Sequence, residues 1–153
     1  MIRTRRTAML ALITAALTLT ACGSDTVGPD AQAAMQKVAG HYVASEGYGA
    51  LSFTTTASGE TIDWLAAGGS LEIDLAADGT TTGRVFVPGA DEDGGDWEAD
   101  LKGSWTLSGG STVRFSHAAD TFVRDMPFTV KDGRLEGDRT FGETRIHVVL
   151  ARR

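Results

Sequence analysis

The chain has 153 residues, of which 14 are basic, 20 are acidic and one is a cysteine, and its formal net charge is −6. This length is typical of one domain that buries its own core. A single cysteine excludes an internal disulfide, and the acidic balance argues against a nucleic-acid-binding protein.

The first 21 residues have the pattern of a secretory signal peptide. Arg3, Arg5 and Arg6 form a basic head, and residues 7–21 are uncharged and mostly alanine, leucine, isoleucine and threonine. A membrane-spanning helix needs ~20 apolar residues, so this run is too short to cross a bilayer comfortably. We therefore expect residues 1–21 to be an export signal.

The end of this signal predicts a lipid anchor. Leu19, Thr20 and Ala21 precede Cys22 and resemble the bacterial lipobox. In that motif, small residues give a signal peptidase access to the backbone, and the cysteine thiol then carries a diacylglyceryl group. We expect lipidation at Cys22. A cleaved signal that ends by chance in a cysteine is the less favoured alternative.

Residues 22–35 are small, polar and rich in glycine and alanine, which predicts a flexible tether with an r.m.s. reach of ~20 Å. Residues 31–37 have room for one or two helical turns. Gly23 and Ser24 follow the cysteine at positions where proteins retained in the inner membrane of enteric bacteria often carry aspartate. By this resemblance the protein is expected in the cell envelope, at the outer membrane and facing the periplasm.

Removal of residues 1–21 leaves 11 basic and 20 acidic residues, a formal charge of −9. A domain this acidic is not expected to seek anionic headgroups or nucleic acid. The sequence therefore predicts attachment to the membrane through acyl chains and not through a basic patch.

Residues 36–153 form one domain with all-β patterning. The clearest strand is residues 97–107, where apolar residues and Gly103 occupy one face while charged and hydroxyl residues occupy the other. Gly103, in mid-strand, predicts a bend or bulge. The other strands are expected over residues 38–43, 50–56, 71–75, 80–87, 113–115, 122–130, 135–140 and 145–150, with a weaker one over residues 62–65.

Short glycine-containing turns separate most of these strands, and Asp78-Gly79 is a typical hairpin signal. Eight or nine strands in sequential hairpin order predict an up-and-down antiparallel β-barrel, because closure removes the exposed edges of the sheet. The densely charged face of residues 97–107 argues against a transmembrane barrel, whose outer face is apolar.

Four parts of the chain resemble the small lipocalin-like lipoprotein domains of bacteria. They are Gly40-His41-Tyr42, residues 71–80, residues 103–110 and Arg152. The resemblance implies a cup-shaped barrel that holds a small apolar molecule. Lipocalins carry a tryptophan where this chain has Tyr42, and the basic partner of that residue is here either Arg145 or Arg152.

Four residues are candidates for ligand binding: Tyr42, Trp97, Leu101 and Trp105. Trp97 and Trp105 share one face of their strand, so both indoles are expected inside the barrel. There they either form a stacking surface for an apolar ligand or fill the interior with side chains.

An acidic, glycine-rich loop spans residues 91–96. Asp91, Asp93 and Asp96 are candidate ligands for a hard cation such as Ca²⁺, although the spacing lacks the full pattern of a calcium loop. A solvated hairpin loop is the favoured interpretation. A second metal hypothesis places His41 and His147 close together on the first and last strands, which neighbour each other in a closed barrel; two ordinary strand histidines are the favoured interpretation.

The sequence contains no nucleophile elbow, P-loop or dinucleotide-binding motif. We therefore expect no catalytic residues, no cofactor and no enzyme activity. The favoured function is that of a membrane-anchored binding protein for a small hydrophobic ligand. The alternative is an envelope adaptor or protease inhibitor that binds a protein partner and has a filled barrel.

Overall fold

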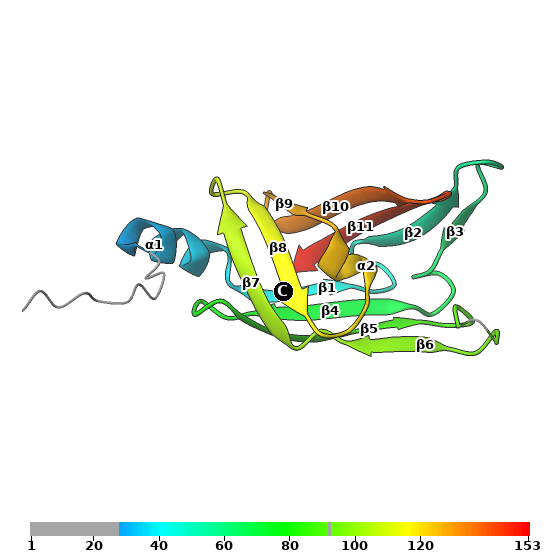
Figure 1. Cartoon of the computed structure of the whole chain (residues 1–153), viewed down its shortest axis with the longest axis horizontal. Helices are drawn as coiled ribbons and strands as arrows, with labels where there is room; N and C mark the ends of the chain where they lie inside the picture. The colour runs from blue at the N-terminus through cyan, green and yellow to red at the C-terminus, as the bar shows by residue number, and fades with distance from the viewer. Residues whose placement is uncertain (1–27, 92) are drawn as a thin grey trace, which may run out of the picture.

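The computed structural model describes residues 28–91 and 93–153, which form eleven strands and two short helices (Figure 1). In chain order these are α1 (Pro29–Val38), β1 (Gly40–Ala44), β2 (Ala50–Thr55), β3 (Thr61–Asp63), β4 (Ser70–Leu75), β5 (Thr80–Val87), β6 (Trp97–Asp100), β7 (Gly103–Ser108), β8 (Thr112–His117), α2 (Phe122–Asp125), β9 (Phe128–Lys131), β10 (Arg134–Phe141) and β11 (Thr144–Arg152).

The eleven strands close into an eight-stranded antiparallel barrel. β1 and β2 pair with successive parts of β11. On their other side, β4 pairs with β1, and β3 pairs with β2. In the same way, β6 and β7 pair with successive parts of β5. When each such pair is counted as one interrupted strand, neighbours in the ring are neighbours in sequence, and β11 closes the ring on β1. The predicted up-and-down barrel is therefore confirmed.

The alternation along residues 97–107 is also as predicted. Leu101 and Trp105 are buried, and the intervening Lys102 and Ser104 are exposed. The strand breaks between Asp100 and Gly103, where a Cβ on Gly103 would lie 2.1 Å from the carbonyl oxygen of Ser116. Glycine at this bend lets the neighbouring strand pass close by.

One predicted strand is wrong over its first half. Residues 122–125 form α2, and β9 begins only at Phe128. Thr121 caps the helix by accepting a hydrogen bond from the backbone N–H of Arg124. Val123 and Met126, spaced by three residues, are both fully buried. A helical turn therefore buries the same apolar residues whose pattern suggested a strand.

The helical turns that residues 31–37 have room for are present, but the helix extends further at both ends than this range. α1 runs from Pro29 to Val38, so part of the expected tether and the start of the first expected strand are helical. Proline suits the first turn of a helix, because its missing N–H has no partner to lose there. Met35 and Val38 are buried against the barrel, and Gln32 donates a hydrogen bond to the carbonyl of Ala77.

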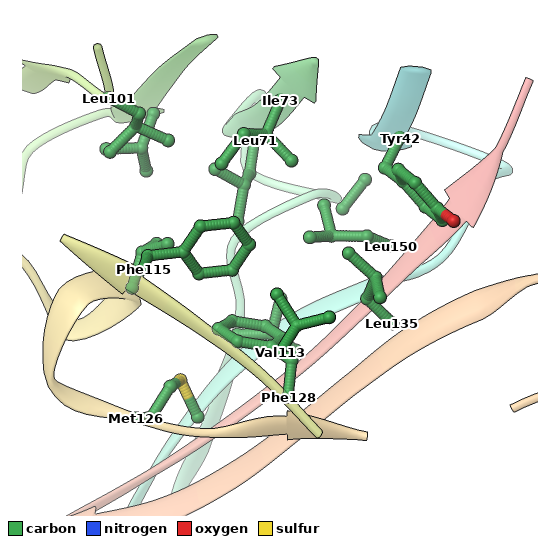
Figure 2. Close-up of a cluster of buried hydrophobic side chains, with 14 of the residues drawn as sticks. Tyr42, Leu71, Ile73, Leu101, Val113, Phe115, Met126, Phe128, Leu135 and Leu150 are labelled. Carbon is green, nitrogen blue, oxygen red and sulfur yellow. The ribbon is translucent and has the colours of Figure 1, made fainter. Parts of the chain in front are cut away.

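The interior of the barrel is filled by apolar side chains that converge from nearly every strand (Figure 2). Phe115 and Phe128 meet edge to face with ring centroids 5.4 Å apart. Gly137 lies under this pair, and a Cβ there would lie 2.8 Å from the Phe128 ring. Tyr42 contributes its ring to the core and donates its hydroxyl proton to the carbonyl of Val38, 2.6 Å away.

Arg152, and not Arg145, is the basic partner of Tyr42. It stands opposite Tyr42 in the β1–β11 register and donates hydrogen bonds to the carbonyls of Lys37 and Ala39, at 2.9 and 2.6 Å. These are the free carbonyls at the C-terminus of α1, where the helix dipole favours a cation. Arg145 is bound to Asp138 on the outer face.

We expect Gly49→Ala to destabilise the barrel far more than Gly47→Ala. Both glycines have positive φ, 81° and 80°, so alanine costs each about 1–2 kcal/mol of backbone strain. At Gly49, however, a Cβ would lie 2.1 Å from the carbonyl oxygen of Val149, whereas no atom lies within 4 Å at Gly47. Overpacking adds about 1–3 kcal/mol at Gly49.

Urea unfolding of the two variants measures this difference. Equal losses of stability would show that the contact between Gly49 and β11 does not constrain the fold.

Candidate ligand site at the mouth of the barrel

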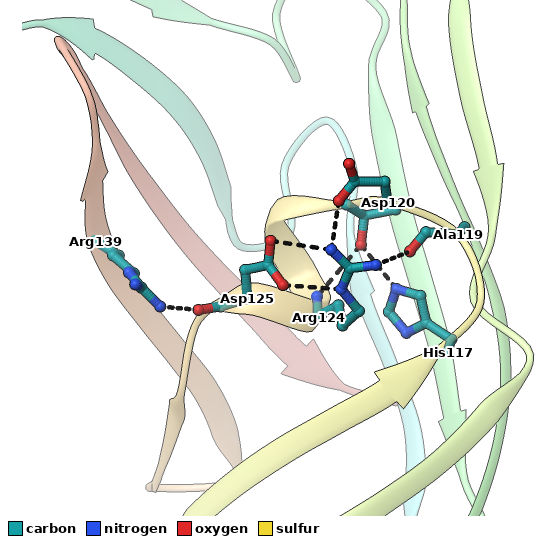
Figure 3. A network of polar contacts seen from close by, with 7 residues as sticks. His117, Ala119, Asp120, Arg124, Asp125 and Arg139 are labelled. Carbon is teal, nitrogen blue, oxygen red and sulfur yellow. Dashed lines mark hydrogen bonds and ion pairs between the residues drawn. The ribbon is translucent and has the colours of Figure 1, made fainter.

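The barrel wall is incomplete at the end opposite α1, which we call the mouth. β8 ends at His117 and β9 begins at Phe128, so the chain between them does not complete the wall at this level. Among the described residues, β6 therefore pairs only with β5, and residues 138–141 of β10 pair only with β11. α2 lies in this gap (Figures 1 and 3).

A pocket of about 330 Å³ lies beside α2 in this gap. Its walls are mainly apolar and its rim carries two carboxylates; the lining residues are Phe53, Val87, Ala90, Trp97, Asp120, Thr121, Phe122, Asp125 and Phe141. The Phe122 ring lies centrally, with centroids 5.6 Å from Phe53 and 6.3 Å from Trp97. Such a site suits an apolar body with a polar end at the rim.

Polar contacts fix α2 to both sides of the gap (Figure 3). The Arg124 guanidinium binds the carboxylates of Asp120 and Asp125 and, at 3.4 Å, the carbonyl of Ala119. Arg139, on β10, donates a hydrogen bond to the carbonyl of Asp125. The hydrogen bond from Arg124 holds the pKa of the Asp125 carboxyl below its usual range. α2 is therefore a short tethered lid over the pocket.

His117 supports the lid from below. Its Nε2 lies 2.7 Å from the hydroxyl of Thr121, and this hydroxyl already accepts the backbone N–H of Arg124. Which of the two atoms donates in this contact is set by the tautomer of the imidazole, because the hydroxyl can donate to Nε2 or accept from it. Among the described residues, the buried Nδ1 of His117 has no partner. Burial, and next the positive charge of Arg124, lower the pKa of His117.

The structure separates the four residues that the sequence suggested for ligand binding. Trp97 lines the mouth pocket. Trp105 is buried, donates its Nε1 proton to the carbonyl of Ala76 at 2.8 Å and faces the α1 end. Tyr42 and Leu101 are fully packed in the core. Ligand binding by any of the four stays a prediction.

Three aromatic residues of the pocket were not singled out from the sequence. Phe53 lies on β2, Phe122 on α2 and Phe141 at the end of β10. The barrel brings them together from positions up to 88 residues apart. The only signal in the sequence is their position near strand ends, which many packed aromatic residues share.

A second, larger groove of about 480 Å³ lies between α1 and β7. Its floor contains Trp105 and Leu107, and α1 contributes Ala31, Ala34 and Met35. This groove has no lining residue in common with the mouth pocket.

The candidate metal ligands do not form a cluster in the described part of the chain. No group of three or more histidine, cysteine, aspartate or glutamate side chains there is placed to hold a metal ion. Asp96 instead accepts a hydrogen bond from the backbone N–H of Gly89, across the loop that holds Asp91 and Asp93. Glu92 lies outside the described residues.

His41 and His147 bind different carboxylates. The Nδ1 atom of His41 lies 2.8 Å from Asp74, and that of His147 lies 3.3 Å from Asp138. In the register of β11, His147 stands opposite Ser52, whereas the backbone carbonyl of His41 accepts the N–H of Arg153. The hypothesis that these two histidines come together is wrong.

Comparison of the chain with protein-family models, with curated proteins and with solved structures found no match.

Neither helix in the described ranges has the length and apolar character needed to cross a bilayer.

The stability of the lid is expected to depend on pH through His117. Folding lowers the pKa of His117, so the unfolded chain binds a proton at this residue more tightly than the folded chain does. The neutral imidazole therefore contributes to the free energy of unfolding at neutral pH. This contribution is lost as the pH falls below the unfolded pKa of about 6.5. We expect the free energy of unfolding to decrease from pH 7.5 to pH 5 by less in His117→Gln than in the wild type. Urea unfolding measures it; parallel profiles would contradict the prediction.

Proposed function

We propose that this protein is a lipid-anchored protein of the bacterial cell envelope whose barrel binds a small hydrophobic molecule in the mouth pocket. The observation that carries the proposal is the aromatic pocket at the interruption of the wall, under a lid held by side-chain contacts. Its volume of about 330 Å³ is at the lower end of the range for ligand sites.

The filled interior defines how such a molecule binds. Apolar side chains occupy the centre of the barrel, so the ligand enters the mouth and contacts Phe53, Trp97 and Phe122. The carboxylates of Asp120 and Asp125 stand at the rim and leave a polar group of the ligand in contact with water. A small amphipathic molecule with an aromatic or aliphatic body fits this distribution.

The contacts around Arg152 support a lipocalin-like domain. Arg152 lies against Gly40, where a Cβ would be 2.7 Å from its Nε atom, and opposite Tyr42. It thereby joins the last strand to the segment before the first strand. Gly40, Tyr42 and Arg152, three of the residues on which the resemblance rests, therefore lie next to one another.

Native mass spectrometry of residues 28–153, exported in the host and purified without detergent, tests ligand binding. We expect a reproducible adduct of a few hundred daltons that Trp97→Ala weakens by up to about tenfold, because an aromatic contact contributes up to about 1.5 kcal/mol. Phe86→Ala is the matched control. Phe86 lies on the outer face of the same β5–β6 hairpin, paired with Glu98.

A bare polypeptide mass in every preparation would contradict ligand binding. The alternative of an adaptor or inhibitor would then be favoured, because a filled barrel works through its surface. Ile62 and Tyr48 are the large apolar residues most exposed in the described ranges, and they would be the first positions to probe for a protein partner.

The lipid anchor has a separate test. Cys22→Ser removes the only thiol, so we expect the protein to lose its acyl mass and to move from the membrane fraction to the soluble fraction. Ser24→Ala, two residues later, is the control. Retention of Cys22→Ser in the membrane fraction would show that another feature holds the protein there.

A further inference from the structure

Basic side chains gather at the α1 end of the barrel. Lys131 and Arg134 face each other across the turn between β9 and β10. The backbone N–H of Arg152 donates to the carbonyl of Gly133 in this turn, and its guanidinium binds the carbonyl of Lys37. Lys37, Lys131, Arg134 and Arg152 are all exposed, and we call them the basic end.

The basic end has no acidic partners of its own. Within the described residues, none of its four cations forms an ion pair, although Asp132 lies in the same turn. Asp30 and Asp78 lie across this end, beside the α1–β7 groove. Lys131 opposite Arg134 is a like-charged pair, which by itself destabilises a sheet.

The opposite half of the molecule is acidic and internally paired. There Arg84 pairs with Glu98, Arg124 with Asp120 and Asp125, and Arg145 with Asp138. The described acidic residues Asp91, Asp93 and Asp96 belong to the same half, in the segment between β5 and β6. Within the described residues, four cations without an ion-pair partner therefore lie together at the α1 end.

The chain leads to the proposed anchor from this same end. Pro29 starts α1, and Cys22 precedes it by seven residues, which span at most ~25 Å when fully extended. A bilayer that holds lipid chains on Cys22 thus lies near α1 and not near the mouth. The apolar α1–β7 groove opens at the same end.

We propose that the basic end docks on a membrane surface that contains anionic phospholipids. Lys37, Lys131 and Arg134 bind headgroup phosphates, while Arg152 remains on the carbonyls of α1. The mouth pocket then faces away from the bilayer, toward the aqueous compartment. This orientation rests on the proposed anchor at Cys22, and it replaces the expectation that an acidic domain ignores anionic headgroups.

The lysines allow a test with an internal control. Outside the export signal the chain has three: Lys37 and Lys131 at the basic end, and Lys102 on the barrel wall. The full-length protein, purified from host membranes, is reconstituted in vesicles of phosphatidylcholine alone or with about one third phosphatidylglycerol. Acetylation of each lysine by an amine-reactive reagent is followed by mass spectrometry.

We expect Lys37 and Lys131 to be acetylated several-fold more slowly when phosphatidylglycerol is present, and Lys102 to be unaffected. Salt at about 1 M, where the Debye length is ~3 Å, should abolish the difference. Equal rates in both vesicles, or equal slowing of all three lysines, would overturn the proposal.

A pair of double variants isolates the charges. Each basic residue near an anionic surface contributes a factor of about five to binding, so Lys131→Gln with Arg134→Gln should remove most of the protection of Lys37. Lys102→Gln with Arg84→Gln makes the same change in net charge on the other half and should leave Lys37 protected. Loss of protection in both would overturn the proposal.

The same spectra report the mass of the Cys22 peptide. An acylated Cys22 with unchanged lysine rates contradicts the docking but keeps the anchor. An unmodified Cys22 contradicts the anchor and with it the docking, because the orientation depends on the anchor. The two failures are therefore distinguishable.

Discussion

Closure of the sheet by β11 is the constraint on which the rest of the structure depends. This nine-residue strand pairs with β10 along one edge and with β2 and then β1 along the other. It thereby joins the two ends of the chain's strand order into a ring and leaves few free edges. Its last residue in the sheet, Arg152, also binds the end of α1, so one strand both closes the wall and covers one end of the barrel.

The candidate site lies where β8 and β9 part and leave the wall incomplete. Where β8 and β9 part, the neighbouring strands keep unpaired edges, and α2 fills the opening with Val123 and Met126 in the core and Phe122 in the pocket. The lid is held by hydrogen bonds and ion pairs at the surface, whose net energies are small, and by the contact between His117 and Thr121. Opening the lid would also expose Val123 and Met126, so the burial of these two side chains contributes most to holding it closed.

The two ends of the barrel differ in chemistry. Within the described residues, the α1 end carries four cations without an ion-pair partner, whereas Arg84, Arg124 and Arg145 of the other half each pair with a carboxylate. A protein held by a short tether beside α1 would present the basic end to the bilayer and the aromatic pocket to the solvent. Delivery or capture of a small apolar molecule away from the membrane surface is consistent with that arrangement.

The sequence by itself determined the all-β class, most strand positions and the up-and-down order, because alternation of apolar residues and glycine turns are local signals. It also placed Trp97 and Trp105 on the inward face. Only the tertiary structure decided that residues 122–125 are helical, that Arg152 is the partner of Tyr42, and that Phe53 meets Phe122. These features, like the separation of charge between the two ends, depend on register and ring closure between distant segments, to which no local pattern is sensitive.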